Sequence, residues 1–166
     1  MSRRGPTTAT TVGIEIEIVD PLWLKPLRTA RAICRSAATL AIAGAATRDR
    51  AVSLTIVLSS DAAVRRLNRD FRHKDKPTNV LSFPAGDHAT APGAPRHLGD
   101  IVLARQTVLR EACRQHKRQR DHLAHLVVHG TLHLLGFDHE ADEDAEAMEA
   151  LETRLLASIG IADPYA

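Results

Sequence analysis

Apolar and polar residues alternate along two stretches in the first part of the chain. This period of two is typical of strands that bury one face, since successive side chains of a strand point to opposite sides. Two shorter apolar stretches further along have the same interpretation. The four predicted strands lie at 12–18, 52–58, 79–83 and 98–103. The segment at 84–97 is rich in Pro, Gly and Ala and is expected to be a mobile surface loop.

Five helices are predicted from apolar residues that recur at intervals of three and four. The first begins near Pro26 and ends at Gly44, because glycine commonly follows a helix C-terminus. The second begins after Ser60 and Asp61, which are good N-cap residues. Its buried face is expected to consist of Val64, Leu67 and Phe71. The last three helices are expected at about 104–118, 120–135 and 141–159.

The order of these elements predicts an α+β fold, with a small mixed four-stranded sheet packed against about five helices. A length of 166 residues is typical of one domain. We therefore expect a single domain over residues 13–166, preceded by a flexible N-terminal tail over residues 1–12.

Composition narrows the class of protein. Cys34 and Cys113 are far apart and form no CxxC motif, which favours a reducing, cytoplasmic setting over a disulfide framework. The N-terminus lacks an apolar run, and the Ala-rich window at 30–46 is interrupted by Arg31 and Arg35. We expect neither a signal peptide nor a membrane span.

Charge is unevenly distributed, although the formal net charge of +2 is too small to imply nucleic-acid binding. Basic residues gather at 65–76 and at 110–120, whereas the segment at 138–152 is strongly acidic. Such a run is as consistent with a solvated helix face as with a binding surface.

Six of the nine histidines lie between His116 and His139. His129 and His133 are four residues apart in an apolar helical pattern, so both imidazoles project from one face of the helix. Gly136 is placed where the chain can turn back and bring His139 to the same point. The spacing predicts that these three histidines ligate one metal ion.

Three protein ligands leave the fourth tetrahedral position open, as in catalytic zinc sites, where bound water has a pKa of about 7. We expect one Zn²⁺ per chain, although imidazoles also suit other divalent transition ions. One histidine on an apolar face is more often a core residue, but three at this spacing favour a metal site.

Other residues near the motif have more than one interpretation. His125 precedes His129 by one turn and is assigned to packing or to a supporting position behind the ligands, because a fourth imidazole would close the open site. Asp138 either orients an imidazole ligand or caps a turn. His116 and His122 are expected at the surface. The acidic residues at 140–144 are expected in the first turn of the last helix, where the helix dipole favours negative charge.

The spacing HxxxHxxGxxH is also that of certain zinc peptidases and predicts a catalytic core like that of zinc metalloproteases. In those enzymes a glutamate follows the first histidine and acts as the general base. Here Gly130 has that position, which disfavours a peptidase unless another residue supplies the base.

The segment HGTLHLLGFDH from His129 to His139 resembles the signature H-G-x-L-H-L-x-G-[YF]-D-H of the YbeY family of bacterial endoribonucleases. The resemblance extends to NRDFRHKDKPTNVLSF at 68–83 and to LGDI at 98–101, and covers most of the chain from about residue 50 onward. Phe137 replaces the commoner tyrosine of the signature.

The resemblance implies a zinc-dependent endoribonuclease that cuts single-stranded RNA, notably in maturation of the 3′ end of 16S rRNA and in ribosome quality control. It also implies partners in the small ribosomal subunit and its assembly factors, with no DNA or membrane expected. By position, Arg72 matches the family's functional arginine, which would contact the scissile phosphate near the zinc. A guanidinium can bind phosphate oxygens bidentately as negative charge develops on them.

The remaining basic residues near Arg72 are expected to hold the RNA backbone, although each is as consistent with a role in solubility. These residues are Arg65, Arg66, Arg69 and Lys74. Because only 3% of residues are aromatic, base stacking is expected to contribute little. Two alternatives stay open: a metal-dependent peptidase or other hydrolase on the same histidines, and a non-catalytic ribosome-assembly factor whose metal serves only to fold the domain.

Overall fold

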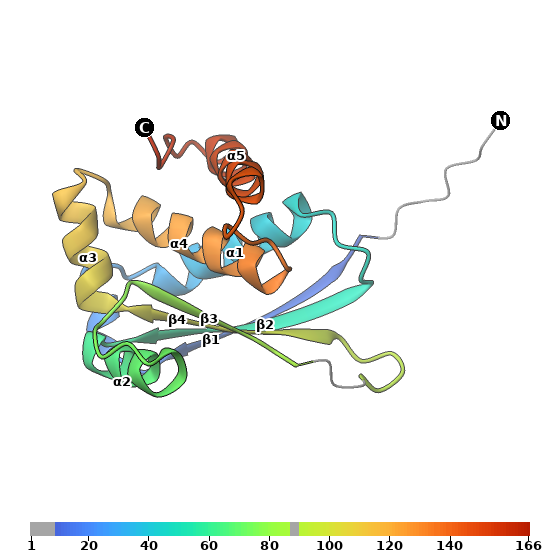
Figure 1. Ribbon diagram of the computed structural model, residues 1–166, viewed down its shortest axis with the longest axis horizontal. Coiled ribbons are helices and arrows are strands. Elements are labelled where there is room, and N and C mark those ends of the chain that lie inside the picture. Colours follow the sequence, from blue (N-terminus) through green and yellow to red (C-terminus); the bar gives the residue numbers. More distant parts are fainter. Residues whose placement is uncertain (1–8, 87–89) are drawn as a thin grey trace.

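The computed structural model describes residues 9–86 and 90–166 and shows a mixed four-stranded sheet in the order β1-β2-β4-β3 (Figure 1). Strands β1 (Thr11–Ile18), β2 (Ala51–Ser59) and β4 (Arg96–Ala104) are parallel. Strand β3 (Val80–Pro84) lies at the edge of the sheet and is antiparallel to β4. The predicted mixed α+β fold with four strands is therefore confirmed.

Helices cover both faces of this sheet (Figure 1). On one face lie α1 (Ala30–Gly44) and α4 (Gln119–Leu134), with α5 (Asp142–Ser158) packed on both of them. On the other face lies α2 (Asp61–Arg72), and α3 (Arg105–Arg114) follows β4 and packs on α4. None of the helices in the described part of the chain is long and apolar enough to cross a membrane.

Alternate residues of β2 point to one face of the sheet and form part of the main core. Val52, Leu54, Ile56 and Leu58 are fully buried and belong to one cluster with the apolar faces of α1, α4 and α5. A smaller cluster lies under α2 and contains Val64, Leu81, Val102 and Ala104. On the face that carries the main core, α4 is the central helix, because it contacts α1, α5 and the sheet.

The start of the first helix differs from the prediction. Residues Pro21–Leu24 form a short 3₁₀ helix, capped where the Leu22 N–H donates to the Asp20 side chain, and α1 begins only at Ala30. Trp23 is fully buried, and its indole N–H donates to the carbonyl oxygen of Ser59 at 2.8 Å. Trp23 thus anchors the segment between β1 and α1 to the sheet, and the helix begins only after this segment.

Two predictions of burial were wrong. Phe71 is 67% exposed, because α2 ends over the edge strand β3, where its ring packs edge-to-face with the ring of Phe83, with centroids 5.6 Å apart. His122, expected at the surface, is buried, because α3 packs on α4 and its Glu111 accepts a hydrogen bond from His122 Nε2 at 2.8 Å.

The expected loop and tail are only partly described. Pro84 belongs to β3, and Arg96 and His97 belong to β4, so the loop between these strands is shorter than predicted. Residues 87–89 of that loop and residues 1–8 of the expected tail lie outside the described residues. Strand β1 begins at Thr11, one residue before the predicted strand and within the expected tail.

Candidate metal centre and basic pocket

The last turns of α4 position two of the three motif histidines. From His122 to Leu134 this helix is buried, except at three positions spaced four residues apart, His125, His129 and His133, which are partly exposed. Because residues at this spacing share one helix face, the three imidazoles form a stripe along α4. The stripe ends at the rim of a pocket lined by His129 and His133.

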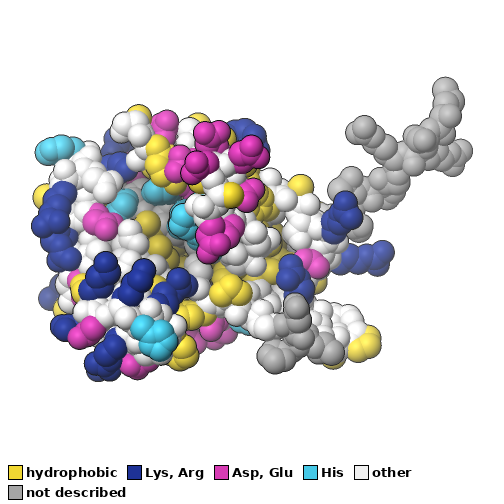
Figure 2. Space-filling view, viewed as in Figure 1, with side chains coloured by type: hydrophobic (Ala, Val, Ile, Leu, Met, Phe, Trp, Pro, Cys, Tyr) yellow, Lys and Arg dark blue, Asp and Glu magenta, His cyan; other side chains and the backbone are white. Residues whose placement is uncertain are grey.

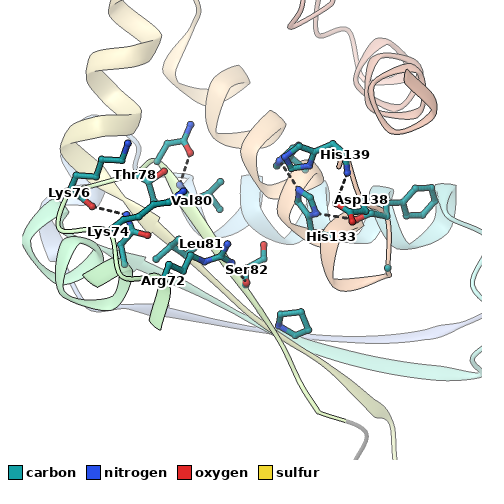
Figure 3. A pocket seen from close by; sticks show the side chains of 16 residues that line it. Arg72, Lys74, Lys76, Thr78, Val80, Leu81, Ser82, His133, Asp138 and His139 are labelled. Atoms are coloured by element: carbon teal, nitrogen blue, oxygen red, sulfur yellow. Dashed lines mark hydrogen bonds between the residues drawn. The ribbon is translucent and has the colours of Figure 1, made fainter. Parts of the chain in front are cut away.

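The turn after α4 brings the third histidine back to the other two. Gly136 has a φ of +95°, the left-handed conformation that glycine adopts without strain. Its N–H donates to His133 O, and the N–H of Phe137 donates to Leu132 O, which is the hydrogen-bond pattern of a Schellman cap. His139 follows three residues later on the same side of the pocket (Figure 3).

The three imidazoles converge closely. Ring centroids are 4.5 Å apart for His129 and His133, 4.8 Å for His133 and His139, and 5.9 Å for His129 and His139. One ring nitrogen from each lies within 4.8 Å of the other two. This is a spacing from which three nitrogens can reach one ion, since metal–nitrogen bonds are about 2.0 to 2.1 Å.

Hydrogen bonds to the Nδ1 atoms set the tautomers of two of these rings. His129 Nδ1 is 2.5 Å from Glu152 Oε1, and His133 Nδ1 is 3.0 Å from the carbonyl oxygen of Phe137. A carboxylate or carbonyl oxygen can only accept, so both Nδ1 atoms carry the hydrogen. When both rings are neutral, the two Nε2 atoms, which are 3.0 Å apart, therefore face each other with their lone pairs.

Facing lone pairs repel unless a proton or a metal cation is shared between them. Burial, followed by the neighbouring His129 and His139, lowers the pKa of His133, which disfavours the protonated form. Neutral imidazole nitrogens are the form that binds transition metals. The donor set therefore fits a divalent metal ion held by His129, His133 and His139.

Glu152 is a site residue that the sequence analysis did not predict. It is fully buried on α5, and its carboxylate contacts both His129 and His125. Burial alone would raise its pKa, but hydrogen bonds from His125, His129 and Tyr165 lower the pKa to about 2. A signal was available, because Glu152 is an acidic residue on the apolar face formed by Met148, Leu151, Leu155 and Leu156.

His125 and Asp138, the two residues expected to support the ligands, lie in different parts of the site. His125 lies behind the cluster, with its Nε2 3.3 Å from Glu152 Oε2. Asp138 lies in the turn after α4, where its Oδ1 accepts the backbone N–H groups of His139 and Glu140 at 2.6 and 3.2 Å. Asp138 thus shapes the turn that carries His139.

The histidines form one wall of a cavity of about 600 Å³ whose opposite wall is basic (Figure 3). Arg72, Lys74 and Lys76 line that wall, together with the end of α2 and strand β3. Arg72 donates from Nη2 to the carbonyl oxygen of Ser82 at 3.0 Å. The buried amide of Asn68 donates to Lys76 O at 2.8 Å and holds the lysine-bearing loop against α2.

The other predicted RNA-contacting residues lie on α2 but do not line this cavity. Arg65 pairs with Asp75 at 2.9 Å and Arg69 with Asp70 at 3.1 Å, and Arg66 is exposed. Figure 2 shows basic side chains gathered over α2 and α3, acidic ones over α5, and histidines in the hollow between them. The structure therefore brings Arg72 and Lys74 to the same cavity as the histidines and leaves the other three outside it.

The fold and the site together define a small α+β protein with a three-histidine centre suited to a metal ion. A family model described as Endoribonuclease YbeY matches residues 27–160. A relative from Paramagnetospirillum magneticum named Endoribonuclease YbeY is 51% identical over 158 residues, covering 93% of this chain and 96% of its own. Another with the same name, from Azorhizobium caulinodans, is 49% identical, covering 92% of this chain and 96% of its own. The chain belongs to the YbeY family of endoribonucleases.

A solved structure supports the fold. The solution structure of a protein from Thermotoga maritima superimposes with a TM-score of 0.57, is 24% identical and covers 88% of each chain.

Proposed function

We propose that this chain is a zinc-dependent, single-strand-specific endoribonuclease, with residues 13–166 acting as one cytoplasmic catalytic domain. Its proposed role is rRNA processing, at the 3′ end of 16S rRNA, together with ribosome biogenesis and quality control. The observation that carries the proposal is the cavity that joins a three-imidazole cluster to a wall of cationic side chains. Membership of the YbeY family supports the same activity.

His129, His133 and His139 would hold the metal ion, and zinc suits three neutral imidazoles with an open position. When bound, the ion supplies Lewis-acid chemistry, lowering the pKa of a water molecule and polarising phosphoryl oxygens. The first contribution of the chain's own residues is to orient the imidazole ligands. Glu152 and the carbonyl oxygen of Phe137 fix the Nδ1–H tautomers and direct the Nε2 atoms of His129 and His133 toward the cavity.

Arg72 is the residue we propose to bind the scissile phosphate. One of its terminal N–H groups is bonded to Ser82 O, which fixes the guanidinium at the cavity wall and leaves its other donors for phosphate oxygens. Cleavage of a phosphodiester builds negative charge on the non-bridging oxygens, and a fixed cation stabilises that charge without reorganising.

Lys74 and Lys76 extend the cationic wall and would bind adjacent phosphates of the strand. We propose that Arg65, Arg66 and Arg69 continue this surface along α2, with weaker effects because two of them already pair with carboxylates. Such contacts read the backbone and carry little sequence information. Recognition of particular RNA sites would then depend on partners, which we propose to be the small ribosomal subunit and its assembly factors.

A contact at the edge strand of the sheet argues against the peptidase alternative. A peptide substrate commonly adds to the exposed edge of a sheet through backbone hydrogen bonds. Here Arg72 occupies the carbonyl oxygen of Ser82 on the edge strand β3, which removes one acceptor that such a peptide would use. This contact favours a phosphodiester over a peptide substrate.

The proposal is tested by measuring zinc content and cleavage of single-stranded RNA for wild type, Arg72→Ala and Arg65→Ala. Arg65 is the matched control, because it lies on the same helix but pairs with Asp75 outside the cavity. We expect Arg72→Ala to retain zinc and lose cleavage by about 100-fold or more, as for loss of one group that stabilises developing charge. Arg65→Ala should reduce cleavage by a much smaller factor, because Arg65 lies outside the cavity and already pairs with Asp75.

Equal cleavage by Arg72→Ala and wild type would remove Arg72 from the mechanism. Wild-type protein that cleaves peptides but leaves single-stranded RNA intact would favour the peptidase alternative instead. Zinc-loaded wild type that cleaves neither substrate, yet binds small ribosomal subunits, would favour the non-catalytic assembly factor.

A further inference from the structure

Three hydrogen-bond donors converge on one buried carboxylate behind the histidine cluster. Glu152 is completely buried, and its two oxygens are contacted by His125 Nε2, His129 Nδ1 and the hydroxyl of Tyr165. An unpaired carboxylate in such a place would be strongly destabilising, whereas one that accepts several hydrogen bonds is held in a single orientation. Glu152 is thus fixed from two sides, by α4 and by the end of the chain.

Tyr165 lies in the segment that follows α5, and several contacts fix its position. Its backbone N–H donates to Asp163 Oδ1 at 2.8 Å, and the neighbouring Pro164 carbonyl oxygen accepts from Lys117 Nζ at 2.8 Å. The ring packs edge-on against His125, with centroids 5.6 Å apart. The C-terminal segment is therefore tied down across α4 and α5, with the phenol directed at Glu152.

Each member of this set has one defined hydrogen-bonding role. Burial and the adjacent Glu152 raise the pKa of Tyr165, so the phenol stays a donor. Glu152 can then only accept, and His129 must present its Nδ1–H to it and its Nε2 lone pair to the cavity. An imidazole that donates to a carboxylate is also a more basic metal ligand.

We propose that Glu152 and Tyr165 are positioning residues for the metal centre, with His125 as the packing partner that keeps them in register. Tyr165 restrains the carboxylate, the carboxylate sets the tautomer and orientation of His129, and His129 presents its Nε2 to the ion. The segment that follows α5 is thereby coupled to metal affinity. This inference rests on the metal site of the proposed function and does not depend on which substrate is cut.

The test compares Zn²⁺ affinity, by competition with a chromogenic chelator, for wild type, Glu152→Gln and Tyr165→Phe. Glu146→Gln is the matched control, since Glu146 is an exposed carboxylate on the same helix. A glutamine presents an N–H₂ group to a site filled with donors, so we expect Glu152→Gln to weaken Zn²⁺ binding by about 10- to 100-fold. Tyr165→Phe removes one restraint and should weaken it by a smaller factor of about 3 to 10.

A second readout separates positioning from general destabilisation. Loaded with Co²⁺, both variants should change the visible absorption spectrum, because a reoriented imidazole alters the ligand field, while Glu146→Gln keeps the wild-type spectrum. Circular dichroism of the metal-free proteins reports whether they are folded. If Glu152→Gln does not fold, the result for Tyr165→Phe decides the test. Tyr165 is 45% exposed, and this change removes only its hydroxyl group.

Folded Glu152→Gln with the affinity and Co²⁺ spectrum of wild type would overturn the proposal, as would a Tyr165→Phe variant indistinguishable from wild type. Wild-type protein that binds no Zn²⁺ would instead overturn the metal site itself, and with it the proposed function.

Discussion

The hydroxyl of Ser82 donates to the carbonyl oxygen of Gly130 at 3.2 Å and joins the edge strand β3 directly to α4. The approach is so close that a Cβ at Gly130 would lie 3.0 Å from Ile101 Cγ2 and 3.1 Å from Ser82 Oγ. Gly130 has the position where zinc peptidases with the HExxHxxGxxH motif carry their glutamate base. A side chain at this position would therefore require Ile101 or Ser82 to shift by a few tenths of an ångström.

Gly130→Ala should lower the free energy of unfolding. Alanine is favoured over glycine within a helix by about 1 kcal/mol, but overpacking against fully buried Ile101 costs about 1 to 3 kcal/mol. We expect a net loss of about 1 kcal/mol in urea unfolding. A more stable variant would show that α4 can move away from the sheet without cost.

Lys74→Ala should reduce the salt dependence of RNA binding. Each phosphate contact to a single strand contributes about 0.7 to the slope of log affinity against log salt concentration. Lys74 lines the cavity, so its loss should lower that slope by about this amount, as measured by titrating labelled single-stranded RNA over a range of KCl concentrations. Lys25→Ala, at an exposed position away from the cavity, is the control, and an equal effect of both changes would contradict a specific contact.

Removal of the metal should abolish RNA cleavage without unfolding the protein. The main core lies between the sheet and helices α1, α4 and α5 and contains none of the three motif histidines. With a chelator we expect the helical circular dichroism to persist and the melting temperature to fall by about 5 to 10 °C, the loss of a ligand that binds only the folded state. His133→Ala should behave like the chelated protein. Global unfolding in either case would indicate a structural metal.

Phe71→Ala should cost less than about 1 kcal/mol of stability, because two-thirds of the side chain is already exposed to water. Leu81→Ala on the adjacent strand is the comparison, since Leu81 is buried in the small cluster under α2 and should cost about 2 to 5 kcal/mol. Urea unfolding of both variants measures the difference. A large loss at Phe71 would mean that its edge contact with Phe83 carries more packing energy than its exposure indicates.

Much of the fold was predictable from local patterns. Alternation located β1 and β2, and helical spacing located α4 and α5, because each pattern reflects burial of one face by its own residues. Phe71 and His122 were assigned wrongly, because their burial depends on what another element does: β3 ends the sheet beside Phe71, and α3 covers His122.

By itself, the sequence determined the three candidate ligands, because the spacing of His129, His133 and His139 around one glycine is set by helix geometry and a local turn. Only the tertiary structure decided what surrounds them. Glu152 reaches His129 from another helix, and Arg72 faces the cavity across the sheet edge. Contacts between segments far apart in the chain leave no period in the sequence, since they arise only when the packed layers bring those segments together.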